Sequence, residues 1–551
     1  MFLSSLLLLA LAPLVSAAPE VTLGQTTLVG RDISGLKQDF FGGIPFAEPP
    51  IGNLRLEPPV LKLQPTNNKS DFDATNFGPS CFQAVLGLLE QGPMSEDCLT
   101  INVFRPSGTK PNAKLPVLFW TYGGGFFAGQ SSMYNGSAIV ARSVARGTPL
   151  IYVNFNYRLG PLGFPQGQEA DDQKALNLAI RDQIAALEWV QANIQTFGGD
   201  NQKVTAFGES AGAIMTSILY FNSPLSKLVR SVILESGSPA SSPIFNAARR
   251  EIDWQNFVGG ISSCADVATS GNTFSCIKAA NSSDIFQGFL NSVELSTELF
   301  PFDPTLDGPD GLLPDIPSKL FSEGQFARVP FITGTNLDEG TLFTSPTINS
   351  EQQVRNSIIA NFSPPIVSVI ELNDTSNMLL KLYPDIPALG SPFNTGNQTF
   401  GLSSVFKQAA AIDGDLSFQS QRRNFNEVAA KAGLKTYGYL FTEPQPGSGQ
   451  LGVFHGSEIA FVYGNLIAPT QTSLVLSSIM MEYWISFATS LDPNDGFGVP
   501  RPLWEQYTTA HPALMQLNGA NLTMIPDDYR EEQIAFINGR AVVFHSRRQV
   551  K

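Results

Sequence analysis

Short apolar runs alternate with longer amphipathic stretches through the middle of this chain, a pattern typical of strands separated by helices. Residues 175–193 carry the period of an amphipathic helix, and residues 21–46 alternate short apolar runs with glycines, as edge strands do. Strands alternating with helices predict βαβ units and a mostly parallel sheet, whose carboxyl edge is where active sites assemble. The apolar runs predict strands at 99–104, 115–122, 150–157, 203–207, 229–234, 329–334 and 436–441.

The strand expected at 203–207 leads into a Gly-x-Ser-x-Gly sequence centred on Ser210. A serine on a sharp strand-to-helix turn brings backbone so close that positions two before and two after it must lack a side chain. Gly208 and Gly212 meet this requirement, and residues 213–220 suit a buried helix. Such a sequence also occurs in ordinary turns, but a strand before it and a helix after it favour a catalytic site. We therefore predict that Ser210 is a nucleophile.

Three glycines, residues 123–125, follow the strand expected at 115–122. Backbone N–H groups that stabilise a tetrahedral oxyanion must approach the substrate with no Cβ between them. This loop and the amide of Ala211, the residue after the nucleophile, supply such a set of donors. A phosphate-binding loop is disfavoured, because no Gly-Lys-Ser/Thr follows, and the glycine spacing of a dinucleotide site is absent. The loop therefore predicts an oxyanion hole.

Three histidines are available to activate the serine. A hydroxyl needs a base with a pKa near the working pH, which is usually histidine. His511 precedes a proline in a polar turn, and His545 lies beside two arginines near the C-terminus. His455 instead lies in a glycine-flanked loop shortly after a strand. By elimination, we predict that His455 is the base.

The acid that orients this base should lie between residues 210 and 455, because nucleophile, acid and histidine follow one another in that order in hydrolases with a Gly-x-Ser-x-Gly turn. Asp338 and Glu339 stand out, because they follow the strand expected at 329–334. Isolated acids are more often solvated surface residues. From the residues alone, both acids remain candidates.

Composition and charge exclude several other classes of protein. Apolar residues make up 43% of the 551 residues and charged ones 15%, which argues against disorder and against a coiled coil. The net charge of −14 leaves no basic surface for nucleic acid or an anionic membrane. We expect a globular enzyme that binds no nucleic acid and uses no cofactor or metal.

The N-terminus has the features of a signal peptide. Residues 2–15 are largely apolar, and the small residues that a signal peptidase requires follow at 16–18. A membrane anchor is the alternative, but the run is short and Pro19 ends it. We therefore expect cleavage after Ala17, secretion, and one catalytic domain over residues 18–551.

The cysteines and glycosylation sequences agree with export. Pairing Cys81 with Cys98 and Cys264 with Cys276 closes two short loops, whereas the other connectivities would tie distant regions together. Each loop should stabilise the fold by about 3 kcal/mol. Asn-x-Ser/Thr sequences mark candidate glycosylation sites at Asn68, Asn135, Asn281, Asn361, Asn373, Asn397 and Asn521.

The segment between Cys81 and Cys98 is apolar and includes Val85, Leu86, Leu88 and Leu89. Its residues 82–90 suit one or two turns of helix. Two interpretations stay open: the segment is part of the core, or it is a flap that covers the site of a lipophilic substrate. As a flap it would flank the entrance and contact acyl chains, favouring medium or long ones.

Together these motifs resemble the type-B carboxylesterase family, which includes cholinesterases and fungal lipases. Residues 102–106 and 390–396 are similar to those of fungal lipases of the Candida rugosa and Geotrichum type, although the segment between the first two cysteines is shorter here. The family motifs occur in the family's order, at 41–50, 95–99, 122–126, 207–212, 338–341 and 454–455.

The resemblance implies an α/β-hydrolase fold, with a large mostly parallel sheet and a short disulfide-closed flap. It implies Glu339 rather than Asp338 as the acid, and the same two disulfides. It also implies a structural salt bridge between Arg55 and Glu96. The oxyanion donors that it implies are the amides of Gly124, Gly125 and Ala211.

The resulting prediction is a secreted serine hydrolase, similar to lipases and sterol esterases, that cleaves lipophilic carboxylic esters through an acyl-enzyme. Its partner would be a small lipophilic ester, with transient contact with a lipid interface. A short-chain carboxylesterase is the first alternative. A catalytically silent, cholinesterase-like binding protein is another, but binding alone would not require Ser210, Glu339 and His455 together. A serine peptidase with the same three groups is a more distant alternative.

Overall fold

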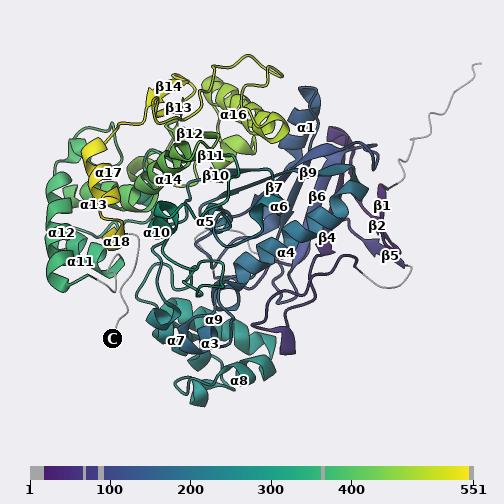
Figure 1. Ribbon diagram of the computed structural model, residues 1–551, viewed down its shortest axis with the longest axis horizontal. Helices are drawn as coiled ribbons and strands as arrows, with labels where there is room; N and C mark the ends of the chain where they lie inside the picture. The colour runs from purple at the N-terminus through teal and green to yellow at the C-terminus, as the bar shows by residue number, and fades with distance from the viewer. Residues whose placement is uncertain (1–17, 66–69, 85–91, 362–366, 545–551) are drawn as a thin grey trace, which may run out of the picture.

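An eleven-stranded sheet forms the centre of the computed structural model, which describes residues 18–65, 70–84, 92–361 and 367–544 (Figure 1). The strands in the described residues are β1 (Glu20–Leu23), β2 (Thr26–Val29), β3 (Arg31–Ile33), β4 (Gln38–Pro45), β5 (Ser70–Asp73), β6 (Thr100–Pro106), β7 (Leu115–Thr121), β8 (Ile151–Phe155), β9 (Gly199–Glu209), β10 (Ser231–Glu235), β11 (Phe331–Asn336), β12 (Thr436–Phe441), β13 (Ala513–Leu517) and β14 (Thr523–Pro526).

The order of the strands places the end of β9 in the middle of the sheet. The large sheet runs β14-β13-β12-β11-β10-β9-β7-β8-β6-β4-β3, and β1, β2 and β5 form a separate small sheet. Adjacent strands from β13 to β8 are parallel, whereas β14 at one edge and β6, β4 and β3 at the other pair antiparallel. The predicted mostly parallel sheet is therefore confirmed, and its parallel strands are buried on both faces.

Helices cover the sheet and form two outer groups (Figure 1). The helices in the described residues are α1 (Ser137–Ala145), α2 (Gly160–Gly163), α3 (Gly167–Asp172), α4 (Leu178–Asn193), α5 (Ala211–Ile218), α6 (Leu225–Leu228), α7 (Glu251–Gly259), α8 (Phe274–Ala279), α9 (Ser282–Leu295), α10 (Pro317–Ser322), α11 (Glu351–Asn361), α12 (Val369–Leu382), α13 (Ser404–Gly414), α14 (Ser420–Lys431), α15 (Ile459–Val462), α16 (Gln471–Ser490), α17 (Glu531–Asn538) and α18 (Ala541–Phe544).

The predicted strands and helices are present, with their ends shifted. The strands expected between 99 and 441 correspond to β6 to β12. The helix expected at 175–193 begins only at Leu178, because Asn177 adopts a left-handed backbone conformation and its side chain donates to the Thr305 carbonyl. The helix expected at 213–220 begins earlier, at Ala211, directly after the proposed nucleophile.

Two hydrophobic cores support the fold. The main core surrounds the sheet and includes side chains of α4, α5 and α16. A smaller core lies among α11, α12, α13, α17 and α18, where Val354, Ile358 and Leu379 are buried together. Figure 1 shows these helices as the left-hand group, on the side of the sheet that carries β11 to β14.

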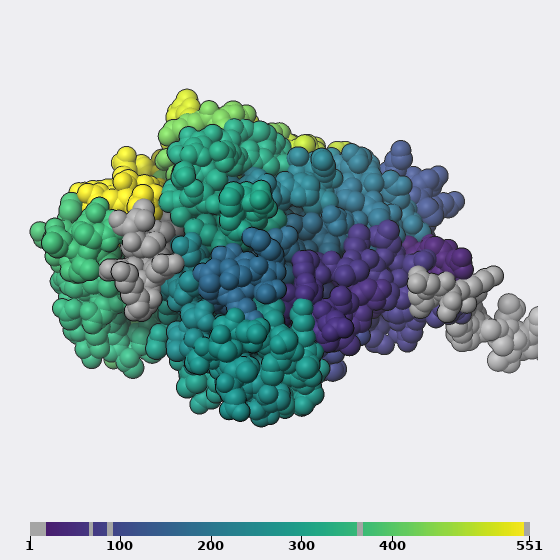
Figure 2. Space-filling view, turned by 60° about the horizontal axis from the view of Figure 1, so that its bottom comes forward, coloured from purple at the N-terminus to yellow at the C-terminus, as the bar shows by residue number. Residues whose placement is uncertain are grey.

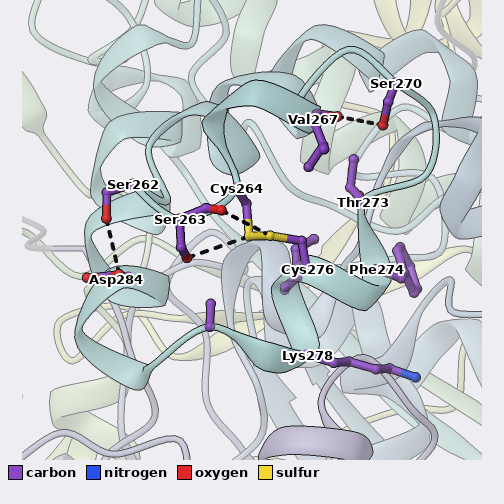
Figure 3. The surroundings of a disulfide bond; sticks show 12 residues. Ser262, Ser263, Cys264, Val267, Ser270, Thr273, Phe274, Cys276, Lys278 and Asp284 are labelled. Carbon is purple, nitrogen blue, oxygen red and sulfur yellow. Dashed lines mark hydrogen bonds between the residues drawn. A yellow bond between two sulfur atoms is a disulfide. The ribbon is translucent and has the colours of Figure 1, made fainter.

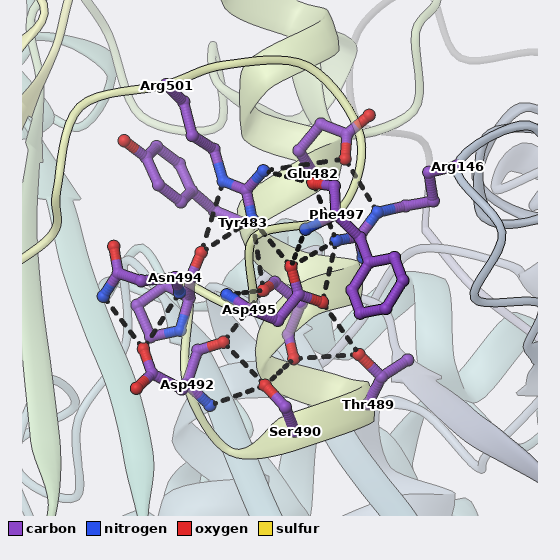
Figure 4. A network of polar contacts seen from close by, with 12 residues as sticks. Arg146, Glu482, Tyr483, Thr489, Ser490, Asp492, Asn494, Asp495, Phe497 and Arg501 are labelled. Carbon is purple, nitrogen blue, oxygen red and sulfur yellow. Dashed lines mark hydrogen bonds and ion pairs between the residues drawn. The ribbon is translucent and has the colours of Figure 1, made fainter.

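A network of ion pairs fastens the C-terminal half of α16 to α1 (Figure 4). The Arg146 guanidinium lies 2.7 Å from Glu482 and 2.6 Å from Asp495, and Arg501 lies 3.1 Å from the same Asp495. All four side chains are almost fully buried. Because each charge has opposite charges as neighbours, the network can be buried without an isolated charge.

Both predicted disulfides are present. Cys81 is bonded to Cys98, and Cys264 to Cys276. Next to the second disulfide, the Ser263 hydroxyl donates a hydrogen bond to the sulfur of Cys264 (Figure 3). The helix turns expected at 82–90, and the apolar side chains at 85–89 that would form a flap, lie mostly outside the described residues. Residues just before them are anchored, because Gln83 accepts a hydrogen bond from the Gly129 amide at 2.8 Å.

Other sequence features fall at the surface or outside the described residues. Residues 1–17, the predicted signal peptide, are outside, as are Asn68 and the side chain of Asn361. Within the described ranges, no helix has the length and apolar character needed to cross a membrane. Asn373 is half-buried on α12, and the exposed candidates for glycosylation are Asn135, Asn281, Asn397 and Asn521.

The ion pair between Arg55 and Glu96 joins three distant segments. Arg55 Nε lies 2.6 Å from Glu96 Oε1, and both side chains are buried. Arg55 also donates to the carbonyl of Ala280 at 2.9 Å, next to the second disulfide loop. Figure 2 shows the purple N-terminal part of the chain lying against the teal region. This pair therefore connects both disulfide loops to the N-terminal segment.

We expect Arg55→Met to lower the free energy of unfolding by about 3 kcal/mol or more, because it leaves the buried Glu96 carboxylate without its partner. The double variant Arg55→Met/Glu96→Gln should lose less, since no uncompensated charge remains. Chemical denaturation of both variants measures the difference. Lys278→Met is the matched control, because it removes a more exposed ion pair with Glu57 in the same region. Equal losses for Arg55→Met and Lys278→Met would contradict this role for the buried pair.

Candidate active site

Ser210 occupies a strained turn between β9 and α5. Its backbone has φ 54° and ψ −125°, which is unusual for a residue with a side chain. A Cβ at position 212 would lie 2.0 Å from the Thr121 carbonyl oxygen, and one at position 208 would lie 2.7 Å from it. Gly208 and Gly212 are therefore required by close approach to β7. The Ser210 amide donates to the Glu235 carbonyl at 2.9 Å, which fixes the turn to the neighbouring strand.

The glycine loop after β7 lies beside this turn. Gly124 and Gly125 both have positive φ, 113° and 61°. The carbonyl of Gly124 accepts a hydrogen bond from the Ala128 amide at 3.1 Å, which closes the loop on itself. Gly125, Ser210 and Ala211 lie together in the wall of one cavity. The structure thus brings two of the three predicted oxyanion donors, Gly125 and Ala211, to the predicted nucleophile. Gly124 directly precedes Gly125 in the glycine loop.

Glu339 follows β11 and contacts His455, which lies in the loop after β12. Its Oε2 atom is 2.5 Å from His455 Nδ1. Its Oε1 atom accepts hydrogen bonds from the Asn336 amide at 2.7 Å and from the Ser236 hydroxyl at 2.6 Å. Because three donors surround this buried carboxylate, its position and that of the imidazole are fixed.

Asp338, the other candidate acid, contacts different groups. Its carboxylate accepts hydrogen bonds from the Ser391 hydroxyl and from the amides of Phe393 and Val453, each at 2.8 Å. It therefore connects the end of β11 to two loops, one of which carries the histidine two residues later. Of the two acids that the sequence left open, the structure brings Glu339 to His455 and gives Asp338 a supporting position.

The second ring nitrogen of His455 faces the turn that carries Ser210. His455 Nε2 lies 3.2 Å from Glu209 Oε1, but it makes no aligned hydrogen bond with any residue that the structure describes. The imidazole packs against the rings of Phe343 and Phe418, with centroid distances of 5.0 and 4.7 Å, and these two rings stack on each other at 5.6 Å. Both rings line the same cavity as Ser210. The imidazole thus packs against two side chains of the cavity wall, and one of its nitrogens is held by Glu339.

The described residues include one other histidine. His511 is exposed and lies 3.0 Å from Glu505, in a turn far along the chain from the glycine loop. His545 is outside the described residues. Of the two described histidines, His455 is the one that contacts Glu339.

Buried carboxyl groups surround the imidazole. Burial would lower the pKa of His455, but Glu339 and Glu209 outweigh this effect and raise it above its ordinary value. Burial raises the pKa of Glu209, and burial together with repulsion from Glu339 raises the pKa of Glu458. The site therefore favours a charged imidazole.

Sequence reasoning did not identify Glu209 and Glu458 as part of this site. Glu458 accepts a hydrogen bond from the Asn336 side chain and lies 3.2 Å from the Ser236 hydroxyl. Their positions in the sequence could have indicated that they lie at the site, since Glu209 directly precedes the predicted nucleophile and Glu458 follows His455 by three residues. Among the described residues, no group of three or more His, Cys, Asp and Glu side chains has an arrangement that could hold a metal ion.

The cavity beside Ser210 has a volume of about 520 Å³. Aromatic side chains, including those of Phe126 and Phe300, form its wall near the glycine loop. Its size falls in the range of sites for small organic ligands. A strained serine, a buried acid–histidine pair and glycine amides at one cavity are the parts needed for acyl transfer.

The chain is similar to proteins of known sequence and structure over nearly its whole length. Lipase 2 of Geotrichum candidum is 35% identical, and the match covers 95% of this chain and 96% of that protein. Secreted lipase 1 of Botryotinia fuckeliana is 34% identical, with 95% and 93% covered. The crystal structure of Aspergillus niger EstA superposes with a TM-score of 0.82 at 26% identity, and covers 96% of this chain and 99% of its own.

A solved structure named PNB esterase superposes with a TM-score of 0.75 at 26% identity, over 94% of this chain. The sequence model of the carboxylesterase family matches residues 17–537. The α/β-hydrolase fold predicted from the sequence motifs is therefore confirmed. This chain belongs to the carboxylesterase family and is a carboxylic ester hydrolase.

Proposed function

We propose that the protein hydrolyses lipophilic carboxylic esters through an acyl-enzyme formed on Ser210. The observation that carries this proposal is the contact of the His455 imidazole with Glu339, beside Phe343 and Phe418, which line the same cavity as Ser210. In the first step the Ser210 oxygen attacks the ester carbonyl, while His455 Nε2 takes the hydroxyl proton. His455 then donates that proton to the departing alcohol, and water, activated by the same base, releases the acid.

Glu339 and the glycine loop support both steps electrostatically. Glu339 accepts a hydrogen bond from the Nδ1–H group of His455, so that Nε2 is the free base before attack, and it stabilises the imidazolium that follows. The amides of Gly124, Gly125 and Ala211 donate to the oxyanion of the tetrahedral intermediate. The Nε2 atom has to turn from Glu209 toward Ser210 for this chemistry. Catalytic hydrogen bonds are often long without substrate and shorten when substrate is bound.

We also propose that the protein acts outside the cell as one catalytic domain covering residues 18–551. Support for export comes from the apolar run at residues 2–15, the two disulfides and relatives that are named secreted lipases. The single domain is supported by the large sheet, whose strands lie between residues 31 and 526. The aromatic part of the cavity wall supports an apolar substrate group next to the ester.

Ser210→Ala should lower kcat for p-nitrophenyl butyrate by about 10⁴-fold or more, because the nucleophile is removed while binding remains. Release of p-nitrophenol by the purified secreted protein measures this. Ser322→Ala, at an exposed position at the end of α10, is the matched control and should keep full activity. Hydrolysis by Ser210→Ala at the rate of the control would refute the proposed mechanism.

The pH dependence of kcat/KM tests the base. Because only neutral His455 can accept the serine proton and nearby carboxylates raise its pKa, activity should rise with pH through an apparent pKa above the usual value of about 6.5. Glu209→Gln removes one of these negative charges and should move the rise about one pH unit lower. Profiles between pH 5 and 9 show the shift. Glu505→Gln, which removes the acid beside His511, is the control and should leave the profile unchanged. A rise that moves to higher pH in Glu209→Gln would contradict the assignment.

A further inference from the structure

The cavity beside Ser210 is polar over much of its wall, which is unexpected for a site that binds only hydrocarbon chains. Hydroxyl groups of Ser241 and Ser242 are buried beside it, and those of Ser345 and Thr347 lie at its exposed rim. Sites for apolar ligands have few polar groups, and those groups fix orientation. This part of the wall therefore indicates a ligand that carries polar groups as well as an apolar part.

Helix α11 turns its polar face toward the cavity. Gln353, Asn356 and Ser357 line the cavity and are spaced three and four residues apart, so they share one face of the helix. Val354 and Ile358 point the other way, into the smaller hydrophobic core. The polar side chains on this helix are thus arranged along the cavity by the packing of the opposite face.

Asp413, at the C-terminal end of α13, is the one ionisable side chain among the described residues that line the cavity. Its Oδ2 atom accepts a hydrogen bond from the Thr344 hydroxyl at 2.7 Å. The same hydroxyl lies 2.9 Å from the Gly340 carbonyl, so its single proton is shared between two acceptors. No Lys or Arg among the described residues lines the cavity to compensate the carboxylate.

The surroundings of Asp413 make its second oxygen available to a ligand. Asp413 is half-buried, and the hydrogen bond that it accepts from Thr344 uses Oδ2 rather than Oδ1. Burial raises the pKa of Asp413 to about 6. The side chain is therefore largely ionised at neutral pH and remains a strong hydrogen-bond acceptor.

An alkyl chain in this part of the cavity would remove water from Asp413 without replacing its hydrogen bonds, which is costly for a charged group. A hydroxyl group would replace the water, because it donates to the carboxylate and accepts from neighbouring hydroxyl and amide groups. A single carboxylate among many neutral polar groups fits a hydroxyl better than it fits a fully charged ligand.

We propose that this pocket selects carboxylic esters that carry a hydroxyl group, and that Asp413, positioned by Thr344, accepts the hydrogen bond from that hydroxyl. The inference rests on the proposed function, since it assigns a substrate class to the site of Ser210. The hydroxyl can belong to the acyl chain or to the alcohol part of the ester, and it presents the same chemistry to Asp413 in both cases.

Matched pairs of esters test this in the wild-type protein. For the acyl chain, p-nitrophenyl esters of 6-, 8- and 10-hydroxy acids are compared with plain esters of equal length. For the alcohol, 1-monooctanoylglycerol is compared with propyl octanoate by titration of the released acid. We expect kcat/KM to be about 10-fold higher for the hydroxylated member of at least one pair, the size expected for a hydrogen bond to a charged group. The arm that shows the preference identifies the source of the hydroxyl.

Variants of Asp413 then test the residue. Asp413→Leu should remove the preference, and Asp413→Asn should reduce it only in part, because an amide oxygen still accepts a neutral hydrogen bond. Asp266→Asn, the same chemical change at an exposed residue in the second disulfide loop, should keep the preference. The ratio of kcat/KM within each pair is the readout, and thermal melting of each variant verifies folding.

Three outcomes would overturn the inference while the proposed function stands. The first is equal hydrolysis of both members of every pair by the wild type. The second is an unchanged preference in a folded Asp413→Leu protein. The third is a larger preference for p-nitrophenyl 6-(trimethylammonio)hexanoate, which would indicate a cation site. A lack of Ser210-dependent hydrolysis of the plain esters would instead overturn the proposed function, and this substrate class with it.

Discussion

The close approach of three backbone segments is the constraint on which the active site depends. The turn at Ser210 is pressed against the carbonyl of Thr121, so that glycine is required at positions 208 and 212. Crowding holds the serine at φ 54° and also brings the glycine loop next to it. The nucleophile and the amides around it are therefore positioned together by one packing arrangement, which the parallel strands β7, β9 and β10 hold in register.

The second constraint is the cost of burying charge around His455. Four glutamates, Glu209, Glu235, Glu339 and Glu458, are buried near one another. Glu339 lies against the imidazole, which can compensate its negative charge. Glu235 instead accepts a hydrogen bond from the Trp484 indole, and burial raises the pKa of Glu235. Differences in local partners thus distinguish four identical side chains in one small volume.

Much of this organisation could be predicted because it is local in sequence. The glycines around Ser210 and the run at 123–125 follow from steric requirements that a few residues reveal, and the strands follow from apolar runs. Glu209, Glu458 and Asp413 could not be assigned in this way. Their roles depend on which distant segments fold against them, and a single acid in a sequence does not show whether it is solvated. The choice between Asp338 and Glu339 was open for the same reason, because adjacent residues point to opposite sides of the chain.

The position of α11 between the smaller core and the cavity has a consequence for how the family can diversify. Val354 and Ile358 hold the helix in a core that is separate from the one around the sheet. Side chains on its other face can therefore be exchanged without disturbing the packing that strains Ser210. Substitutions on this one helix could change which esters a family member binds while the catalytic residues stay the same. Substrate recognition and reactivity are therefore free to evolve at different rates.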